Sequence, residues 1–266
     1  MKLFTKTWHQ DLIWLKWAFR SVYKFCDEPI VWYVVAENNI CDEIKRIAEE
    51  CDKSSNSSYA HKIIVHGLDA WPEEATIKDK WLAQQWIKMT AHRIIGSDLV
   101  WNWDSDVFAQ KHFTEADFLG KNNLPIYWFS DLDRLRGDKF YHILRQRADL
   151  IERLFGNISV SREWMRCMPI PLIGTILKSG EQTQIWGKCY KECAANNKTF
   201  SEFNVVGQFA NLNFIDEFDW RDANVSGPTW AGSFGNQSIV VQNFSWGGET
   251  TEVKNWIQRE FGENNG

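Results

Sequence analysis

No run in the sequence approaches the ~18 consecutive apolar residues that a membrane-spanning helix needs, so an ordinary transmembrane protein is excluded. The first residues, Met1–His9, lack the apolar stretch of a secretory signal peptide. There is also no internal repeat and no low-complexity linker. From these absences we expect a cytoplasmic protein built as one domain, residues 1–266, rather than a repeat array or a set of tethered modules.

The six cysteines include no CxxC pair. Cys189 and Cys193 are spaced to share a helix face, but no matching histidine or second pair accompanies them, which argues against a zinc site. Free thiols in a reducing compartment are the simpler interpretation. Asn-x-Ser/Thr triplets such as Asn157–Ser159 are then not expected to be glycosylated.

An excess of positive charge is absent, since 35 acidic residues against 30 basic ones give a net charge of −5, and this argues against a protein that is basic throughout. The distribution is uneven, however. The stretch from Arg134 to Arg147 carries five basic residues against one acid, Asp138. It is interpreted either as a solvated helix face or as a patch that binds a polyanion. The five basic residues are Arg134, Arg136, Lys139, Arg145 and Arg147.

What the sequence does have is enough apolar material for a large core. Hydrophobic residues make up 44% of the 266 and charged residues 24%, which is typical of a globular protein. Tryptophan is abundant, with 16 copies. We expect most of these rings to fill the core, while some are available to recognise a flat surface such as a sugar face or a nucleobase.

Apolar periodicity predicts alternating strands and helices. This order favours an α/β fold, a three-layer sandwich with a mostly parallel central sheet. Residues 227–248, rich in Gly, Ser, Asn and aromatics, are expected to form a β-hairpin or a loop-rich lid. Strands are expected at Leu3–Thr7, Ile30–Ala36, Lys62–Val65, Asp98–Trp103 and Pro125–Ser130, and helices at His9–Phe25, Cys41–Cys51, Trp81–Ile95 and Phe140–Phe155.

The segment that indicates chemistry is Asp104-Ser105-Asp106, directly after the strand expected at Asp98–Trp103. In open α/β sheets, ligands bind beyond the carboxyl ends of the strands. Two carboxylates at such a position suit a hard divalent cation that also binds phosphate oxygens. The alternative is a turn in which an aspartate caps its own backbone.

This segment resembles the DxD motif of GT-A glycosyltransferases. The helix Trp81–His92, with its W-x-x-Q-Q-x-x-K pattern, is similar to that of a small bacterial and phage-type GT-A group. Phe200–Gly207 resembles the aromatic-Ser-Glu-aromatic segment of the same group. The likeness covers roughly residues 1–215, with these three local matches rather than continuous identity. It implies a GT-A fold, a nucleotide-diphosphate sugar donor, and Mn or Mg as cofactor. Residues 1–130 would bind the donor, and residues 131–266 would bind the acceptor and form the lid.

The resemblance also implies roles for single residues. Asp106 would bind the metal, and Asp104 would bind the metal or the donor ribose. Gln85 and Lys88 would line the donor site, with Lys88 facing the diphosphate. A solvated helical lysine is the other interpretation of Lys88.

At the end of the first strand, the resemblance places the nucleotide base near Thr5 and Lys6. Asp11 begins the next helix, where the helix dipole alone accounts for an acid. One departure concerns the metal, because many GT-A enzymes add a C-terminal histidine ligand and the last histidine here is His142. Asp219, Asp222 or water is expected to replace it.

An inverting transferase needs a carboxylate that accepts the proton of the acceptor hydroxyl. Glu202 is the candidate that the resemblance suggests, and Asp131, at the end of the strand Pro125–Ser130, is the second. Thr199–Glu202 also reads as a capping box that opens a helix. A retaining enzyme would need no such base.

The sequence therefore predicts a glycosyltransferase with one of two acceptors. One is a hydroxymethylated base of phage DNA, approached by base flipping and by the basic stretch Arg134–Arg147; the protein would then work in the host cytoplasm. The other is a cell-surface or capsule glycan. A third hypothesis is a non-catalytic nucleotide-sugar-binding module.

Overall fold

The computed structural model describes residues 1–55, 57–73, 77, 79–156, 158–164, 168–196, 200–223, 238–242 and 250–262. They form two compact units. The first unit contains Met1–Asp69, Trp101–Asp117 and the described part of Pro228–Gly266; the second contains Ala70–Val100 and the described part of Phe118–Gly227. The single domain with a functional boundary at residue 130 stays a prediction.

Parallel strands form the core of the first unit. β1 pairs with β2 in register from Lys2↔Val31 to Lys6↔Val35, and β2 pairs with β3 in the same direction. β4 lies parallel to β1 on its other side. The first two residues of β4 belong to the second unit, in which β8 lies next to β4 and completes the order β3-β2-β1-β4-β8. The bounds are β1 Lys2–Lys6, β2 Val31–Val35, β3 Lys62–His66, β4 Leu99–Asn102 and β8 Ile170–Ile173.

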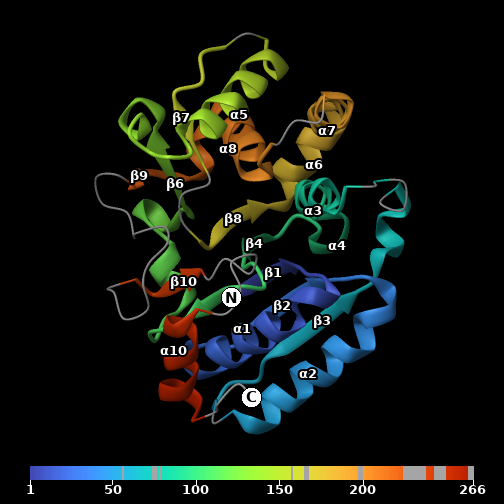
Figure 1. Cartoon of the computed structure of the whole chain (residues 1–266), viewed down its shortest axis with the longest axis vertical. Coiled ribbons are helices and arrows are strands. Elements are labelled where there is room, and N and C mark those ends of the chain that lie inside the picture. The colour runs from blue at the N-terminus through green and yellow to red at the C-terminus, as the bar shows by residue number, and fades with distance from the viewer. Residues whose placement is uncertain are drawn as a thin grey trace. The chain divides into compact units, whose positions relative to one another are not determined.

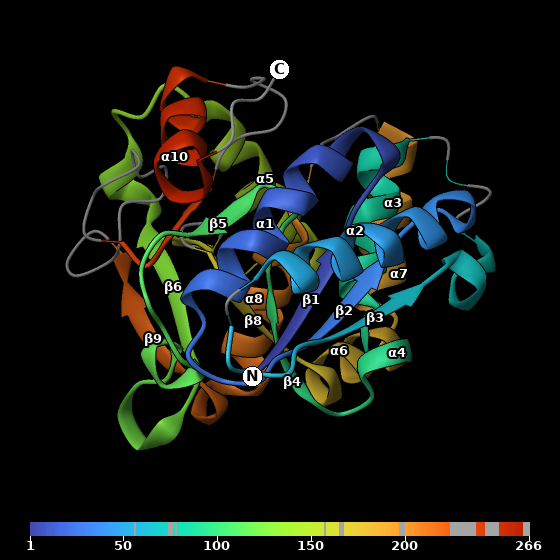
Figure 2. The same ribbon diagram turned by 90° about the horizontal axis from the view of Figure 1, so that it is seen from below.

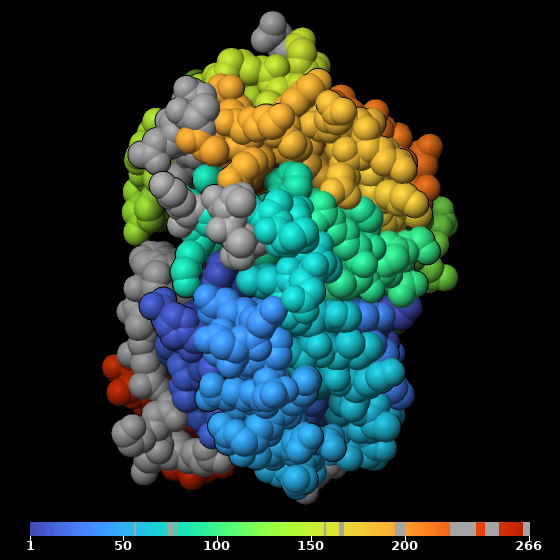
Figure 3. Space-filling model, turned by 90° about the vertical axis from the view of Figure 1, so that its right-hand side faces the viewer, coloured from blue at the N-terminus to red at the C-terminus, as the bar shows by residue number. Residues whose placement is uncertain are grey.

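Two helices connect these strands and pack on one face of β1–β3 (Figure 2). They are α1 (Leu12–Phe25) and α2 (Cys41–Ser54). Their common face follows from the right-handed crossover that parallel strands require. α1 buries a stripe of large apolar residues at helical spacing, including Leu15, Phe19 and Val22. On the face that Figure 3 draws, α2 and the residues after it, in light blue and cyan, form much of the surface of this unit.

The last described helix, α10 (Thr251–Phe261), completes the first unit beside α1 (Figure 2). Its Trp256 ring stacks on Phe108 with centroids 5.3 Å apart, and its Phe261 ring lies 5.4 Å from that of Trp17. Just before it in the described chain, β10 (Val240–Gln242) pairs antiparallel with β5 (Val107–Ala109). Aromatic packing therefore joins residues that are about 150 positions or more apart in the sequence.

The second unit has its own three-stranded sheet, in the order β7-β6-β9 (Figure 1). β6 runs parallel to β9 and antiparallel to β7. Helices make up most of the rest of this unit. The strands are β6 Ile126–Asp131, β7 Arg162–Glu163 and β9 Asp219–Asp222, and the helices are α3 Lys80–Met89, α4 His92–Ile95, α5 Tyr141–Leu154, α6 Gly174–Gln182, α7 Ile185–Asn196 and α8 Glu202–Asn213. Short 3-10 helices lie at His9–Asp11, Asn38–Ile40, Leu68–Ala70, Glu115–Phe118, Lys121–Asn123, Leu132–Leu135 and Ile215–Glu217.

The α/β fold with a mostly parallel central sheet, predicted from the sequence, is confirmed. One predicted helix is wrong in its length, because Trp81–Ile95 is two helices, α3 and α4. Thr90 interrupts it: its hydroxyl donates back to the carbonyl of Trp86 (2.7 Å) and accepts from the indole of Trp71 (2.8 Å). Gly96 follows the last residue of α4 with φ +65°, a positive φ that glycine adopts without strain.

The strand expected at Pro125–Ser130 is β6, and it lies outside the five-stranded sheet because it pairs with β7 and β9. Of the lid predicted for residues 227–248, only 238–242 lie within the described residues. Most tryptophans fill the core as expected, with at least nine of the 16 buried. The five described cysteines are free thiols. No helix of the described chain is both long and apolar enough to cross a membrane.

Candidate functional site

The strand β4 leads directly to Asp104 and Asp106, the two carboxylates of the predicted metal-binding motif. It pairs with β1 through Leu3↔Trp101 and Phe4↔Asn102, and the amide of Trp103 then donates to the carbonyl of Phe4 (2.8 Å). The rings of Trp101 and Trp103 are completely buried. The backbone is thus held to β1 up to the residue that precedes Asp104.

A tight turn follows and directs both carboxylates. The amide of Val107 donates to the carbonyl of Asp104 (3.0 Å), and the indole of Trp103 donates to the carbonyl of Val107 (2.7 Å). Asp104 is half-buried, whereas Asp106 is only 7% exposed. β5 begins at Val107, so the turn is fixed by strands on both sides.

Two amide side chains contact the carboxylates. Asn102 Nδ2 donates to Asp104 Oδ1 (3.0 Å), and Gln242 Nε2 donates to Asp106 Oδ1 (3.2 Å). Asn102 is completely buried, and its Oδ1 has no hydrogen-bond partner among the described residues. A buried oxygen without a hydrogen-bond partner, on a side chain that contacts the Asp104 carboxylate, is the type of hard ligand that a divalent cation takes together with carboxylates. The residues present therefore fit Mg or Mn.

Asn102 and Gln242 were not predicted as site residues. A polar Asn between two tryptophans at the end of an apolar strand is a signal that could have found the first. No local signal marks Gln242, because β10 brings it to Asp106 across 136 positions of sequence.

The predicted donor-site residues Thr5, Lys6 and Asp11 belong to the first unit and lie at or just after the end of β1. The Thr5 hydroxyl is buried, accepts from the indole of Trp32 (2.8 Å) and donates to the carbonyl of Trp103. Thr5 thus supports the segment before Asp104. The Lys6 ammonium is buried, donates to the carbonyl of Thr7 (2.6 Å) and lies 3.3 Å from the centroid of Trp8.

Asp11 is the residue before α1, and its side chain does not cap that helix by a hydrogen bond. The interpretation of Asp11 as a helix-dipole acid is consistent with that position. Contact of Thr5, Lys6 and Asp11 with a nucleotide stays a prediction.

In the second unit, Lys88 and Glu202 form an ion pair at 2.9 Å. Each side chain is 2% exposed, so the interpretation of Lys88 as a solvated lysine is wrong. Gln85 is also buried, and its Oε1 accepts from the backbone amide of Glu202 (2.9 Å). Two residues of α3 thus contact Glu202, the first residue of α8: Lys88 through the ion pair and Gln85 through the hydrogen bond. Gln85, Lys88 and Glu202, the residues that the resemblance indicated in the segments Trp81–His92 and Phe200–Gly207, therefore lie together.

Glu202 does not take part in the predicted capping box. α8 begins at Glu202 with Ser201 as its N-cap, whereas a capping box would place Glu202 three residues after the cap. Thr199 lies outside the described residues. Burial, and then the charge of Glu202, raise the pKa of the Tyr127 phenol far above its usual range, so Tyr127 stays protonated and donates to the carbonyl of Phe203 (3.2 Å).

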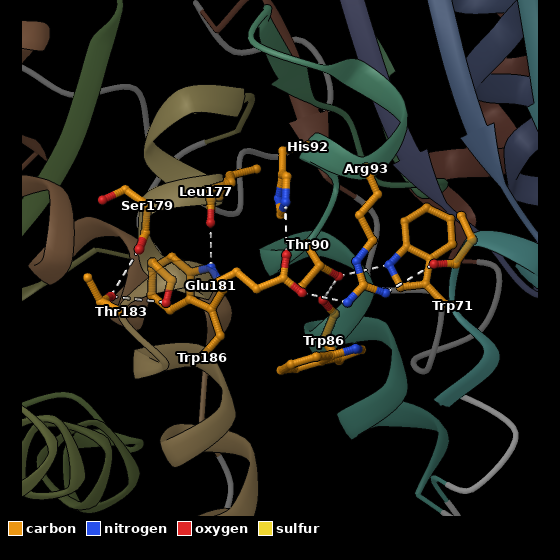
Figure 4. A network of polar contacts seen from close by, with 12 residues as sticks. Trp71, Trp86, Thr90, His92, Arg93, Leu177, Ser179, Glu181, Thr183 and Trp186 are labelled. Atoms are coloured by element: carbon orange, nitrogen blue, oxygen red, sulfur yellow. Dashed lines mark hydrogen bonds and ion pairs between the residues drawn. The ribbon is translucent and has the colours of Figure 1, made fainter.

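A polar network in the second unit holds α3 and α4 to α6 (Figure 4). The Arg93 guanidinium reaches Glu73 and Glu181, both at 2.5 Å, and His92 Nε2 lies 2.9 Å from Glu181 Oε2. The indole of Trp86 donates to Glu73 (2.9 Å). Because Gln85 and Lys88 lie on the same helix as Trp86, this network fixes the helix that presents them.

Asp131, the second candidate base, is the last residue of β6 and is half-buried. Its carboxylate accepts from the amide of Asp133 (2.9 Å), so it caps the short helix that follows. This leaves oxygen lone pairs available on the same carboxylate.

The basic stretch of the second unit has acidic partners that the local sequence did not reveal. Arg134 pairs with Asp222 (3.1 Å), and Arg136 pairs with Asp133 (2.6 Å). Arg145 pairs with both Asp149 and Glu152 (2.7 and 2.8 Å). Lys139 lies 4.8 Å from the ring of Phe140, and Arg147 is partly buried. The net positive charge of this surface is therefore smaller than the five residues suggest.

Asp219 and Asp222, which were expected to replace a histidine as the third metal ligand, lie in β9 and form ion pairs with arginines. Asp219 accepts from Arg221 (2.7 Å), and Asp222 accepts from Arg134. Within the described ranges, no three His, Cys, Asp or Glu side chains are grouped to hold a metal. A third ligand from Asp219 or Asp222 stays a prediction.

No protein-family model matches the chain, and no curated protein sequence matches it. Among solved structures, mouse xyloside xylosyltransferase 1 in its apo form is similar, with a TM-score of 0.45 and 11% identity over 84% of this chain and 86% of that one. The glycosyltransferase GlyE of Streptococcus pneumoniae TIGR4 gives TM-scores of 0.42 at 12% and 14% identity in two structures, over 84% of this chain and 45% of GlyE. All three structures are of glycosyltransferases, and at these identities and TM-scores the likeness concerns the fold alone.

Proposed function

We propose that this chain is a metal-dependent glycosyltransferase that moves a sugar from a nucleotide-diphosphate sugar to an acceptor hydroxyl. One observation carries the proposal: Asp104 and Asp106 lie in a tight turn directly beyond the carboxyl end of β4, beside the end of β1. Ligands of open parallel sheets bind at this edge. The intact carboxylate pair favours an enzyme over a non-catalytic binding module.

The residues of the turn would hold the cation together. Asp104 and Asp106 would supply carboxylate oxygens. Asn102, whose side chain contacts Asp104, would supply its side-chain oxygen as a further hard ligand. A bound Mn or Mg ion would supply positive charge that neutralises the diphosphate leaving group. Gln242 orients Asp106 by its hydrogen bond, and the buried Trp103 ring keeps the turn in place.

For an inverting reaction, the structure favours Asp131 over Glu202 as the proton acceptor. Glu202 is 2% exposed and paired with Lys88, so it has little access to an acceptor hydroxyl. We propose instead that Glu202 positions α3 and α8, with Gln85 and Lys88. Asp131 is half-buried at a strand end and keeps unused lone pairs.

The test compares Asp106→Asn with a matched control, Asp42→Asn, an aspartate of the same unit whose side chain is 96% exposed. Melting temperatures are measured with a panel of nucleoside diphosphates, each in Mn²⁺ or in EDTA. A ligand at about 100 times its Kd adds about 2.7 kcal/mol of stability, or roughly 5–11 °C in a unit of this size. We expect a metal-dependent shift in the unmodified chain and in Asp42→Asn, and none in Asp106→Asn. An equal shift in all three proteins would refute the assignment of the metal to Asp106.

A glycan hydroxyl is the acceptor that the charge distribution favours, because carboxylates pair with Arg134, Arg136 and Arg145. DNA is the second candidate, since Arg134 and Arg136 are still 56% and 70% exposed. If DNA is bound there, affinity should fall steeply with salt, and neutralising both arginines should flatten the slope by about two units. Duplexes with 5-hydroxymethylcytosine or cytosine, a sugar-nucleotide panel and mass spectrometry test the transfer itself. No added mass and no salt-dependent binding would exclude the DNA acceptor.

A further inference from the structure

A cavity of about 520 Å³ opens in the first unit, at the edge of the sheet opposite the Asp104–Asp106 turn. The turn follows the carboxyl end of β4. α1 begins after the carboxyl end of β1 and returns the chain to the start of β2, so its last turn lies at the amino edge. Tyr23 and Lys24 of that last turn line the cavity. The cavity is therefore separate from the proposed catalytic site.

Three helices end at this cavity. Lys24 lies in the last turn of α1, Ser54 is the last residue of α2, and Phe261 is the last residue of α10. The carboxyl end of a helix carries unpaired carbonyl oxygens and about half a negative charge. This arrangement disfavours a phosphate and favours a ligand with hydrogen-bond donors.

The charged side chains around the cavity compensate one another. Lys24 Nζ lies 2.8 Å from Glu260 Oε2, and His112 Nδ1 lies 3.0 Å from Asp27 Oδ1. The lining contains two cations, Arg20 and Lys24, and two anions, Asp27 and Glu260, so their charges sum to zero. A site with balanced charge does not select a strongly charged ligand of either sign.

Serine hydroxyls add acceptors to the wall. Ser54 Oγ donates to the carbonyl of Cys51 (3.0 Å), and Ser55 Oγ donates to that of Asp52 (2.9 Å). A hydroxyl has one donor and two acceptor lone pairs, so each oxygen still accepts from a ligand O–H. The ligand that suits this wall is rich in hydroxyl donors.

Aromatic rings and the Cys26 thiol also line the cavity. Tyr59 is 37% exposed, and rings of this kind pack on the apolar faces of flat or ring-shaped ligands. Burial raises the pKa of the Cys26 thiol to about 11, so it remains protonated and is a poor ligand for a soft metal.

From the acceptor-rich wall, the balanced charge and the aromatic surface, we propose that this cavity binds a neutral saccharide. Its volume lies within the range of sites for small molecules, about 300–1,000 Å³. The proposal is independent of the transferase assignment, because none of the cavity residues belongs to the Asp104–Asp106 turn.

The test uses saturation-transfer NMR and calorimetry with maltose, lactose, cellobiose, sucrose and diacetylchitobiose as probes. Tyr59→Ala removes the exposed ring, and Ser58→Trp fills the cavity from an exposed loop position. Phe140→Ala is the matched control, an aromatic of the second unit that is 45% exposed. Asp106→Asn reports binding at the other site, and inorganic phosphate and spermidine serve as charged probes.

We expect at least one disaccharide to bind saturably, with affinity at least tenfold lower in both cavity variants and unchanged in Phe140→Ala and Asp106→Asn. The nucleotide-dependent melting shift should survive in both cavity variants, which separates failure here from failure of the proposed function. The proposal is overturned if no disaccharide binds, if binding is lost in Asp106→Asn rather than in the cavity variants, or if phosphate or spermidine binds in place of the saccharides.

Discussion

Replacing Glu202 by Gln leaves the Lys88 ammonium buried next to a neutral amide. At 2.9 Å the pair attracts with about 6 kcal/mol for an effective dielectric constant of about 20, and desolvation of two side chains that are each 2% exposed offsets most of this. Breaking such a pair from one side costs about 3–5 kcal/mol, because the remaining charge stays buried. We therefore expect Glu202→Gln and Lys88→Met each to lower the melting temperature by roughly 6–20 °C.

The double variant Lys88→Met/Glu202→Gln removes both charges together. It should recover at least about 2 kcal/mol relative to the sum of the single losses, since coupled neighbours are not additive. Urea denaturation of the four proteins, followed by tryptophan fluorescence, measures this coupling. Single losses below about 1 kcal/mol, or strict additivity, would refute the view that Glu202 and Lys88 position the helices. A large loss of turnover with unchanged stability in Glu202→Gln would instead restore Glu202 as the base.

Two further predictions concern the second unit. Burial lowers the pKa of His92, although the charge of Glu181 opposes this. The unfolded chain therefore binds the proton more readily. The free energy of unfolding should fall as pH decreases below about 6.5, by at most about 1.4 kcal/mol per pH unit from this group. His92→Gln should flatten this pH dependence, measured by urea titration, and an unchanged slope in the variant would contradict the prediction. A Cβ at Gly174 would lie 1.9 Å from the carbonyl oxygen of Gly96, so Gly174→Ala should cost about 1–3 kcal/mol. Gly187→Ala, in α7 with open space around it, should be neutral or stabilise by up to about 1 kcal/mol, and equal effects of the two substitutions in thermal denaturation would refute this account.

Strong local patterns predicted much of the first unit. The apolar β-branched run Ile30–Ala36 forms β2, and the periodic segment after His9 forms α1. Asp104 and Asp106 do follow a parallel strand, as the sequence indicated. Each of these features is set by residues within a few positions of one another.

Features that depend on distant residues were missed. The break at Thr90 depends on the indole of Trp71, and the partner of Arg134 is Asp222, 88 positions later. Whether a strand such as β6 joins one sheet or another leaves little trace in its own apolar pattern. The burial of Glu202 likewise depends on α3, more than a hundred residues earlier.

The aromatic stack between Trp256 and Phe108 has a consequence for biosynthesis. The ribosome makes Phe118–Gly227, the larger part of the second unit, between these two residues. The hydrophobic face formed by α1 and β5 therefore stays uncovered until β10 and α10 emerge. During translation the first unit therefore exposes aromatic surface that is a target for chaperones. A nascent chain stalled before β10 should be recognised as incomplete, even though its parallel strands β1–β4 have already been made.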